Sequence, residues 1–307
     1  LSKVDQNIIT DLIDTFNKIP SSGIAANQIG YEKRIFIGYN ANQDNDNEEY
    51  EIDTSHVVDL SIPYNFNGKQ PNFYDVEKGE LIPLKTGGES WSVAEGAGCN
   101  VPEISMNIHC SGTHTESVGH LLKNTGDIGS KLKDGFLPTT LITVSAEPFK
   151  NTMDSYHCDV KGNESVITAE AIKNEFDTWL NMKPQVLIIR SLPNPKEKRF
   201  LRFNESPPPF FTNDALIYIH ELGIKHLIVD LPSVDRMSDN GILGNHRLFW
   251  GDGLNPKGEV NPQSEKTITE LAYIPSSVED GFYFLNIQIP HLVCDAAPSR
   301  PLLYRVT

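Results

Sequence analysis

The sequence has little positive charge. Its 307 residues include 26 Lys and Arg against 41 Asp and Glu, which gives a formal net charge of −15. Binding to nucleic acid needs a basic face that neutralises phosphates. The densest basic cluster, residues 196–199, is interrupted by Glu197. We therefore expect no nucleic-acid partner.

The sequence also has no long apolar run and no paired cysteines. No stretch approaches the roughly 18 consecutive apolar residues of a membrane helix, and the first residues are polar and acidic, unlike a signal peptide. The four cysteines lie far apart and form no CxxC pair, which excludes a zinc ribbon or a dithiol redox motif. We expect a reducing, cytoplasmic setting and no membrane partner.

Apolar patterning predicts an α/β fold. Strands are expected at 139–146, 186–191 and 226–230, where apolar residues run almost without a break. Helices are expected from Thr168 and over 213–222, where apolar residues recur at helical spacing. Strands that alternate with helices are typical of α/β folds with parallel pairing.

One stretch concentrates the side chains that bind divalent metals. Residues 109–120 contain His109, Cys110, His114, Glu116 and His120. In an extended segment His114 and Glu116 project to the same side, because they are two residues apart. A polar loop with hydrogen-bonded histidines is the alternative, but this density favours a metal or catalytic site.

The same stretch resembles the HxGTHxDxPxH signature of the cyclase family, which includes bacterial kynurenine formamidase and isatin hydrolase. Residues 112–114 fall on GTH, Glu116 on the Asp and His120 on the last His. Further segments resemble family motifs in the same order: 56–63, 230–235, 245–247, 269–271 and 295–300.

The resemblance implies a swivelling β/β/α domain and a hydrolase that cleaves the C–N bond of a small formamide, lactam or related amide. The implied cofactor is a divalent metal, Zn or Mn. The implied catalytic residues are His120, as the general base, and His246. The implied metal ligands are Cys110, His114, Glu116, His246 and Glu270. The resemblance also implies a homodimer or homotetramer and a small-molecule substrate.

Three departures from the signature leave alternatives open. Cys110 stands where the family has its first His, so the ligand is Cys110 as thiolate, His109 brought in by a bulge, or neither. Glu116 is longer than the family's Asp, and Val118 replaces its Pro. An altered or inactive member that binds a small ligand or a metal is the alternative function.

A second resemblance is confined to the N-terminus. Residues 22–30 are similar to the first motif of peptide deformylases, but the two other deformylase motifs are absent. Deformylase activity is therefore not expected. We divide the chain into an N-terminal extension, residues 1–45, and a hydrolase domain, residues 46–307.

Overall fold

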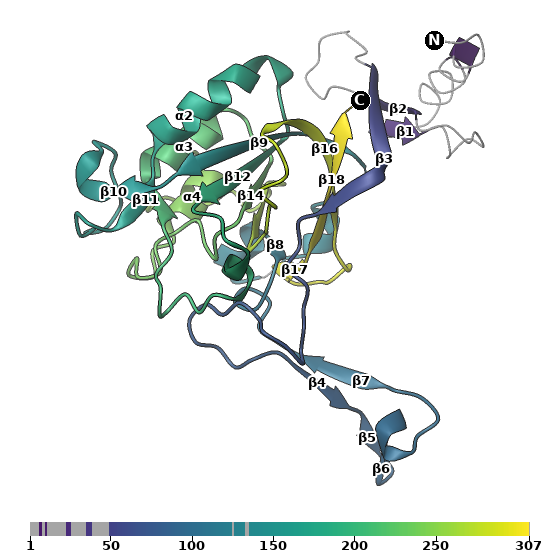
Figure 1. Cartoon of the computed structure of the whole chain (residues 1–307). Coiled ribbons are helices and arrows are strands. Elements are labelled where there is room, and N and C mark those ends of the chain that lie inside the picture. The colour runs from purple at the N-terminus through teal and green to yellow at the C-terminus, as the bar shows by residue number, and fades with distance from the viewer. Residues whose placement is uncertain are drawn as a thin grey trace.

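The alternating strands and helices build one large mixed sheet with helices on one face (Figure 1). The computed structural model describes residues 49–306 apart from 125, 133 and 134, together with 6, 7, 10, 23–25 and 35–38. In sheet order the strands are β1 (Gly23–Ala25), β2 (Ile35–Gly38), β3 (Glu49–Asp59), β18 (Arg300–Val306), β16 (Gly281–Gln288), β9 (Leu137–Ser145), β12 (Val186–Leu192), β14 (His226–Val229), β15 (Thr267–Glu270), β8 (His114–Ser117) and β17 (Ala296–Pro298).

The centre of the sheet is parallel and carries the helices. β9, β12, β14 and β15 run parallel to one another, and the sheet continues in antiparallel pairs on both sides. The α-helices of this layer are α2 (Ala169–Phe176), α3 (Asn213–Glu221) and α4 (Gly244–Trp250). The predicted strands and helices of the region 139–230 and the α/β class are confirmed.

The remaining elements are short. β10 (Glu147–Pro148), β11 (Ser165–Ile167) and β13 (Phe210–Phe211) form a small separate sheet. The 3-10 helices are η2 (Val93–Glu95), η3 (Val118–Leu121), η4 (Ile128–Ser130), η5 (Phe149–Asn151), η6 (Asp177–Met182) and η7 (Lys196–Phe200). None of the described helices is long and apolar enough to cross a membrane.

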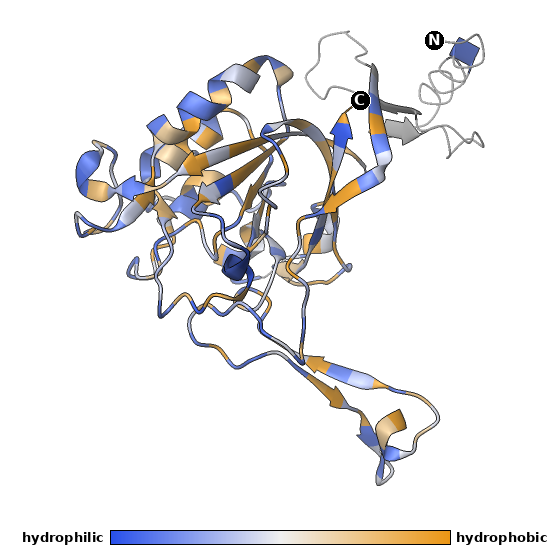
Figure 2. Cartoon of the chain, in the orientation of Figure 1, coloured by the Kyte–Doolittle hydropathy of each residue, from blue (hydrophilic) through white to orange (hydrophobic). Residues whose placement is uncertain are grey.

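Both faces of the central strands are buried, which explains their continuous apolar sequence. On β12, Leu187 and Ile189 pack with α2 and α3, whereas Val186 and Ile188 belong to the apolar cluster on the opposite face. Successive strand residues point to opposite faces, and complete burial of such a side chain contributes about 1.5–3 kcal/mol. Figure 2 shows these strands in the orange of apolar residues beneath the helices.

The sequence also determines where the helices begin and end. The Thr168 hydroxyl accepts a hydrogen bond from Ala171 N at 3.2 Å at the start of α2, as expected of an N-cap residue. Gly223, with φ of 73°, follows the end of α3 in the left-handed conformation that glycine adopts freely. These two residues set the start of α2 and the end of α3.

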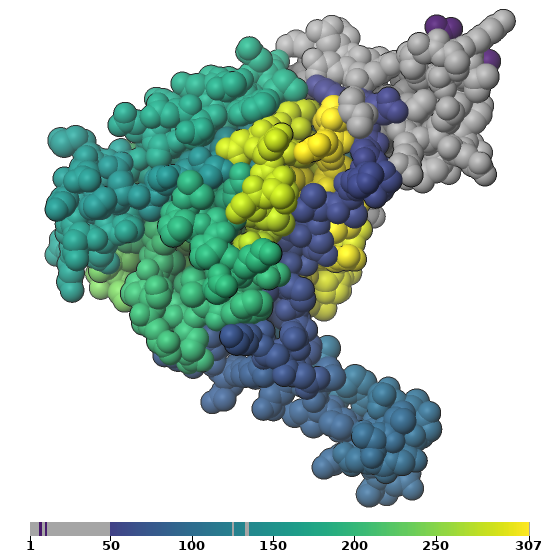
Figure 3. All heavy atoms as spheres, viewed as in Figure 1, coloured from purple at the N-terminus to yellow at the C-terminus, as the bar shows by residue number. Residues whose placement is uncertain are grey.

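A two-stranded ribbon, residues 80–105, projects away from the sheet (Figures 1 and 3). It pairs β4 (Glu80–Pro83) with β7 (Pro102–Ser105), and its tip holds β5 (Lys85–Thr86) and β6 (Glu89–Ser90). Apolar patterning predicted none of these strands. The ribbon was missed because the partner of β4 lies some twenty residues further along the chain.

The proposed division into residues 1–45 and 46–307 stays a prediction. Most of residues 1–45, including most of the deformylase-like segment 22–30, lies outside the described residues. The described strands β1 and β2 pair with each other, and β2 pairs with β3.

Candidate metal centre

The centre is built on β8, which lies between β15 and β17 in the sheet. Glu270 on β15 is paired with His114, and Glu116 is paired with Ile268 on one side and Ala296 on the other. His114 and Glu116 are fully buried and share one face of the strand, because they are two residues apart. The strand register therefore places two carboxylates and an imidazole together.

Helix α4 contributes the fourth side chain, His246. Asp235 fixes the start of this helix, because its Oδ1 accepts from Asn245 N at 2.9 Å and its Oδ2 from His246 N at 3.2 Å. Asp235 Oδ2 also accepts from His246 Nδ1 at 2.7 Å. The other ring nitrogen, Nε2, then lies 2.9 Å from Glu116 Oε1 and 3.6 Å from Glu270 Oε1.

Two inward-facing atoms of this cluster are buried acceptors that have no donor. His114 Nδ1 lies 3.0 Å from the carbonyl oxygen of Gly112, so Nδ1 is the donor and Nε2 carries a lone pair. That Nε2 lies 3.6 Å from Glu270 Oε2. Among the described residues, His114 Nε2 and Glu116 Oε2 are buried without a hydrogen-bond partner. A bound cation would satisfy both atoms.

Two groups of candidate ligands meet at Glu116. Its carboxylate lies within 4.8 Å of ligand atoms of His246 and Glu270 in one group, and of His109 and His114 in the other. Nitrogen and carboxylate oxygen donors of this kind suit Zn or Mn. The residues therefore fit a divalent metal.

The electrostatics of the buried groups point the same way. Burial alone would raise the pKa of Glu116, but His120 and His246 hold it well below its usual range. Burial and the charge of Glu116 both raise the pKa of Glu270, yet the neighbouring imidazoles of His114 and His246 bring it below its usual value. Burial lowers the pKa of His246, but Glu116 and Asp235 raise it well above normal. The carboxylates therefore stay ionised, and their negative charge favours a bound cation.

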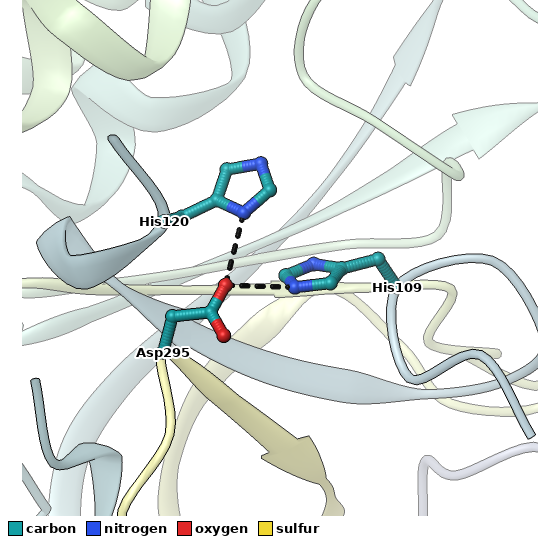
Figure 4. Close-up of side chains that lie close together, drawn as sticks. All are labelled: His109, His120 and Asp295. Carbon is teal, nitrogen blue, oxygen red and sulfur yellow. Dashed lines mark hydrogen bonds and ion pairs between the residues drawn. The ribbon is translucent and has the colours of Figure 1, made fainter. Parts of the chain in front are cut away.

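The solvent side of the centre is formed by His109, His120 and Asp295 (Figure 4). Asp295 Oδ2 lies 3.0 Å from His109 Nε2 and 3.1 Å from His120 Nδ1. The two imidazole side chains are about one quarter exposed, whereas the side chain of Glu116 behind them is 1% exposed. Among the residues of the centre, His109 and His120 are therefore nearer to solvent than Glu116.

The structure brings most of the residues singled out in the sequence into one place. His114, Glu116, His246 and Glu270 lie together, and His120 Nδ1 lies 3.8 Å from Glu116 Oε2. Their roles as ligands and as general base stay predictions.

Cys110 and His109 differ in their surroundings. Cys110 packs in an apolar cluster with Ile62, Phe73 and Leu271, and burial, together with the charge of Glu270, raises the pKa of its thiol to about 11. The groups of candidate ligand atoms found within the described chain contain His109 and not Cys110. His109 Nδ1 lies 3.1 Å from Glu116 Oε2.

Two carboxylates of the site had no role assigned from the sequence. Asp235 orients His246 and Asp295 joins His109 to His120. Both lie in segments that resemble family motifs, 230–235 and 295–300. That resemblance was the available signal, but it does not say which side chains the carboxylates contact.

Comparison with known proteins gives two family matches. The family model described as Putative cyclase matches residues 53–236. The model described as Polypeptide deformylase matches residues 2–68. Curated relatives include a protein named kynurenine formamidase from Bacillus cereus, 27% identical over 207 residues, with 64% of this chain and 78% of the relative covered. A kynurenine formamidase from Bacillus thuringiensis subsp. konkukian is 27% identical over 208 residues with the same coverage.

Solved structures show the same fold at low identity. A crystal structure described as a novel cyclase has a TM-score of 0.54 at 14% identity and covers 82% of this chain and 89% of its own. Isatin hydrolase A from Labrenzia aggregata has a TM-score of 0.51 at 13% identity, with 82% and 94% covered. These likenesses confirm the fold type expected from the sequence.

Proposed function

Because the chain belongs to the cyclase family, whose model matches residues 53–236, we propose that it is a metal-dependent amidohydrolase. The reaction is hydrolysis of a carbon–nitrogen bond in a small formamide, lactam or related amide. The observation that carries the proposal is the pair of buried acceptors that have no hydrogen-bond partner. They are His114 Nε2, which faces Glu270, and Glu116 Oε2, and a divalent cation would complete both.

The residues that would hold the metal are His114, Glu116, His246 and Glu270. For the remaining position the geometry supports His109 over Cys110, because His109 Nδ1 lies beside Glu116 and Cys110 lies in an apolar cluster. Nitrogen and oxygen donors accept both Zn and Mn, so metal analysis has to decide between them. When bound, the ion supplies Lewis-acid activation of water and of the substrate carbonyl.

His120 is proposed as the general base. Its Nδ1 lies 3.1 Å from Asp295 Oδ2, so the carboxylate accepts the Nδ1 proton and leaves Nε2 free to take a proton from the attacking water. The same nitrogen can return the proton to the leaving nitrogen, which balances the hydrolysis. Asp235 holds Nδ1 of His246, so Nε2 is the nitrogen that would face a bound metal.

Metal content and turnover, measured together, test the proposal. We expect purified protein to retain Zn or Mn and to hydrolyse N-formylkynurenine or a related aromatic formamide. His114→Ala should lose both metal and turnover, because a buried ligand is removed. Glu175→Asp, an exposed change on α2, is the matched control. A purified protein with far less than one metal ion per chain would contradict the proposal. Full activity of His114→Ala would contradict it as well.

The alternative function is a non-catalytic member that binds a metal or a small ligand. The departures at Cys110, Glu116 and Val118 motivate it. Stoichiometric metal without turnover of any formamide, lactam or imide would favour this alternative over the hydrolase.

We also propose that the chain acts as a homodimer or homotetramer. Leu81 and Ile104 are paired across the ribbon and are 43% and 58% exposed. A two-stranded ribbon alone is marginally stable in water, so a second copy that covers these side chains would stabilise it. Four free cysteines support a reducing, cytoplasmic setting.

A further inference from the structure

Tyr156 lies outside the candidate centre but contacts it through one hydrogen bond. It follows η5 in a segment without regular structure. Its hydroxyl accepts from Arg236 N at 2.8 Å and lies 3.0 Å from Asp235 Oδ1. A hydroxyl has a single proton, and the backbone N–H already donates to its oxygen. The tyrosine proton is therefore directed to Asp235.

The ring of Tyr156 is held in place by its neighbours. It packs edge-on against Phe210, with 4.8 Å between the ring centroids, and lies 4.1 Å from the ring of His157. Burial and the charge of Asp235 raise the pKa of Tyr156 above its usual value. The phenol thus stays a neutral donor over the whole range in which the protein would work.

Asp235 is the link between Tyr156 and the centre. Its Oδ1 accepts from the Tyr156 hydroxyl and Asn245 N, and its Oδ2 accepts from Nδ1 and N of His246. Each carboxylate oxygen offers about two acceptor positions, so these four donors saturate the group. Only one of the four comes from a side chain outside α4, and that side chain is Tyr156.

The nearby His157 cannot easily replace this donor. Asn245 Nδ2 donates to the carbonyl oxygens of Phe211 and Val234, which fixes the orientation of its amide, and its Oδ1 then accepts from Asn213 Nδ2. That same Nδ2 lies 3.1 Å from His157 Nδ1, so Nδ1 is an acceptor and the proton of the neutral ring is on Nε2.

His157 Nε2 lies 4.0 Å from Asp235 Oδ1 and 3.5 Å from Asp239 Oδ2. Both distances are beyond a normal hydrogen bond. The donor that holds Asp235 from outside the helix is therefore the Tyr156 hydroxyl.

We propose that Tyr156 is a positioning residue for the metal ligand His246 and acts through Asp235. Its hydroxyl keeps the Asp235 carboxylate in the plane that holds the His246 ring, so that Nε2 points at Glu116 and Glu270. The inference rests on the proposed function only in taking His246 as a metal ligand. Loss of a partner that orients a ligating histidine typically weakens metal binding about 10- to 100-fold.

The test compares Tyr156→Phe with Tyr283→Phe. Tyr283 donates its hydroxyl to the carbonyl oxygen of Glu279 at 2.7 Å on β16, so the control removes a buried tyrosine hydroxyl that makes no bond to the centre. Chelator-stripped proteins are titrated with Zn²⁺ or Mn²⁺ against a chromophoric chelator. We expect Tyr156→Phe to bind the metal about tenfold more weakly. This is the lower end of the 10- to 100-fold range, because Tyr156 contacts Asp235 and not His246 itself. Tyr283→Phe should match the unmodified protein.

A second measurement separates positioning from a merely structural role. In metal-free protein with nitrogen-15 histidine, the Nδ1 proton of His246 reports its bond to Asp235. We expect its resonance to shift and its exchange to quicken in Tyr156→Phe and to stay unchanged in Tyr283→Phe. Unchanged metal affinity, or an unchanged His246 resonance, in Tyr156→Phe would overturn the inference. If the unmodified protein binds no metal, the proposed function itself fails and the inference fails with it, which is a distinct outcome.

Discussion

Replacing Glu116 by Asp should weaken metal binding, although Asp is the residue of the family signature. Glu116 Oε1 lies 2.9 Å from His246 Nε2, and Oε2 lies 3.1 Å from His109 Nδ1. Its backbone cannot advance to compensate for a shorter side chain, because Glu116 is paired with Ile268 on one side and Ala296 on the other. The shorter carboxylate therefore withdraws from both imidazoles.

The size of the effect follows from these distances. One C–C bond is about 1.5 Å, so the carboxylate oxygens withdraw to roughly 4.5 Å from both ring nitrogens. Metal–oxygen bonds of about 2.0–2.2 Å tolerate little such displacement. Even partners behind a ligand are typically worth 10- to 100-fold in affinity. We expect at least about a 100-fold rise in the metal dissociation constant, about 2.8 kcal/mol.

The assay is a competition titration with a chromophoric chelator, accompanied by kcat/KM on a formamide. Glu116→Gln keeps the side-chain length and removes the charge. Comparing it with Glu116→Asp therefore separates the effect of side-chain length from that of charge. Glu175→Asp on the exposed side of α2 controls for a generic Glu-to-Asp effect. If Glu116→Asp bound metal within about twofold of the unmodified protein, Glu116 would not be a ligand at its present reach.

Three further outcomes are expected. His120→Ala should lower kcat about 10²- to 10⁴-fold, as loss of a general base does, with metal content unchanged by elemental analysis; loss of metal instead would make His120 a ligand. In metal-free protein, burial lowers the pKa of His109, but the neighbouring carboxylates of Asp295 and Glu116 outweigh it and raise the pKa to about 10. Protonated His109 then stabilises the folded protein fully below about pH 6.5, and this stabilisation is lost as the pH rises towards 10. Tm should therefore fall over this window, and His109→Asn should flatten the fall. An equal slope of Tm against pH in the variant would refute this. Leu81→Lys together with Ile104→Lys should yield a smaller species in light scattering, and an unchanged mass would show that the ribbon is not a subunit contact.

Local patterns were sufficient for the α/β core but not for its connectivity. The apolar run of β12 and the N-cap Thr168 predict a buried strand and the start of α2, because burial and capping are local properties. Nothing local says that β8 lies between β15 and β17. Those strands are about 150 and 180 residues further along the chain, and their pairing depends on the whole sheet.

The candidate site divides in the same way. The spacing of His114 and Glu116 predicts that they share a face, and β8 places them so. His246 and Glu270 could be joined to them only through the family resemblance. In an extended strand His109 would face away from His114, so the sequence left His109, Cys110 and neither as alternatives, but residues 108–110 form a turn. In a turn the alternation of side chains does not apply, and Cys110 N is bonded to Asn107 Oδ1 at 3.0 Å.

Two departures from the family signature meet in a single contact. The first histidine is displaced by one position, to His109, and the carboxylate two residues after His114 is longer by one methylene. In the structure these two side chains reach each other, with Glu116 Oε2 at 3.1 Å from His109 Nδ1. The longer carboxylate therefore compensates for the displaced imidazole. Restoring the family's Asp alone would break the contact without restoring the histidine at position 110, which is why the family residue is expected to be the weaker one in this chain.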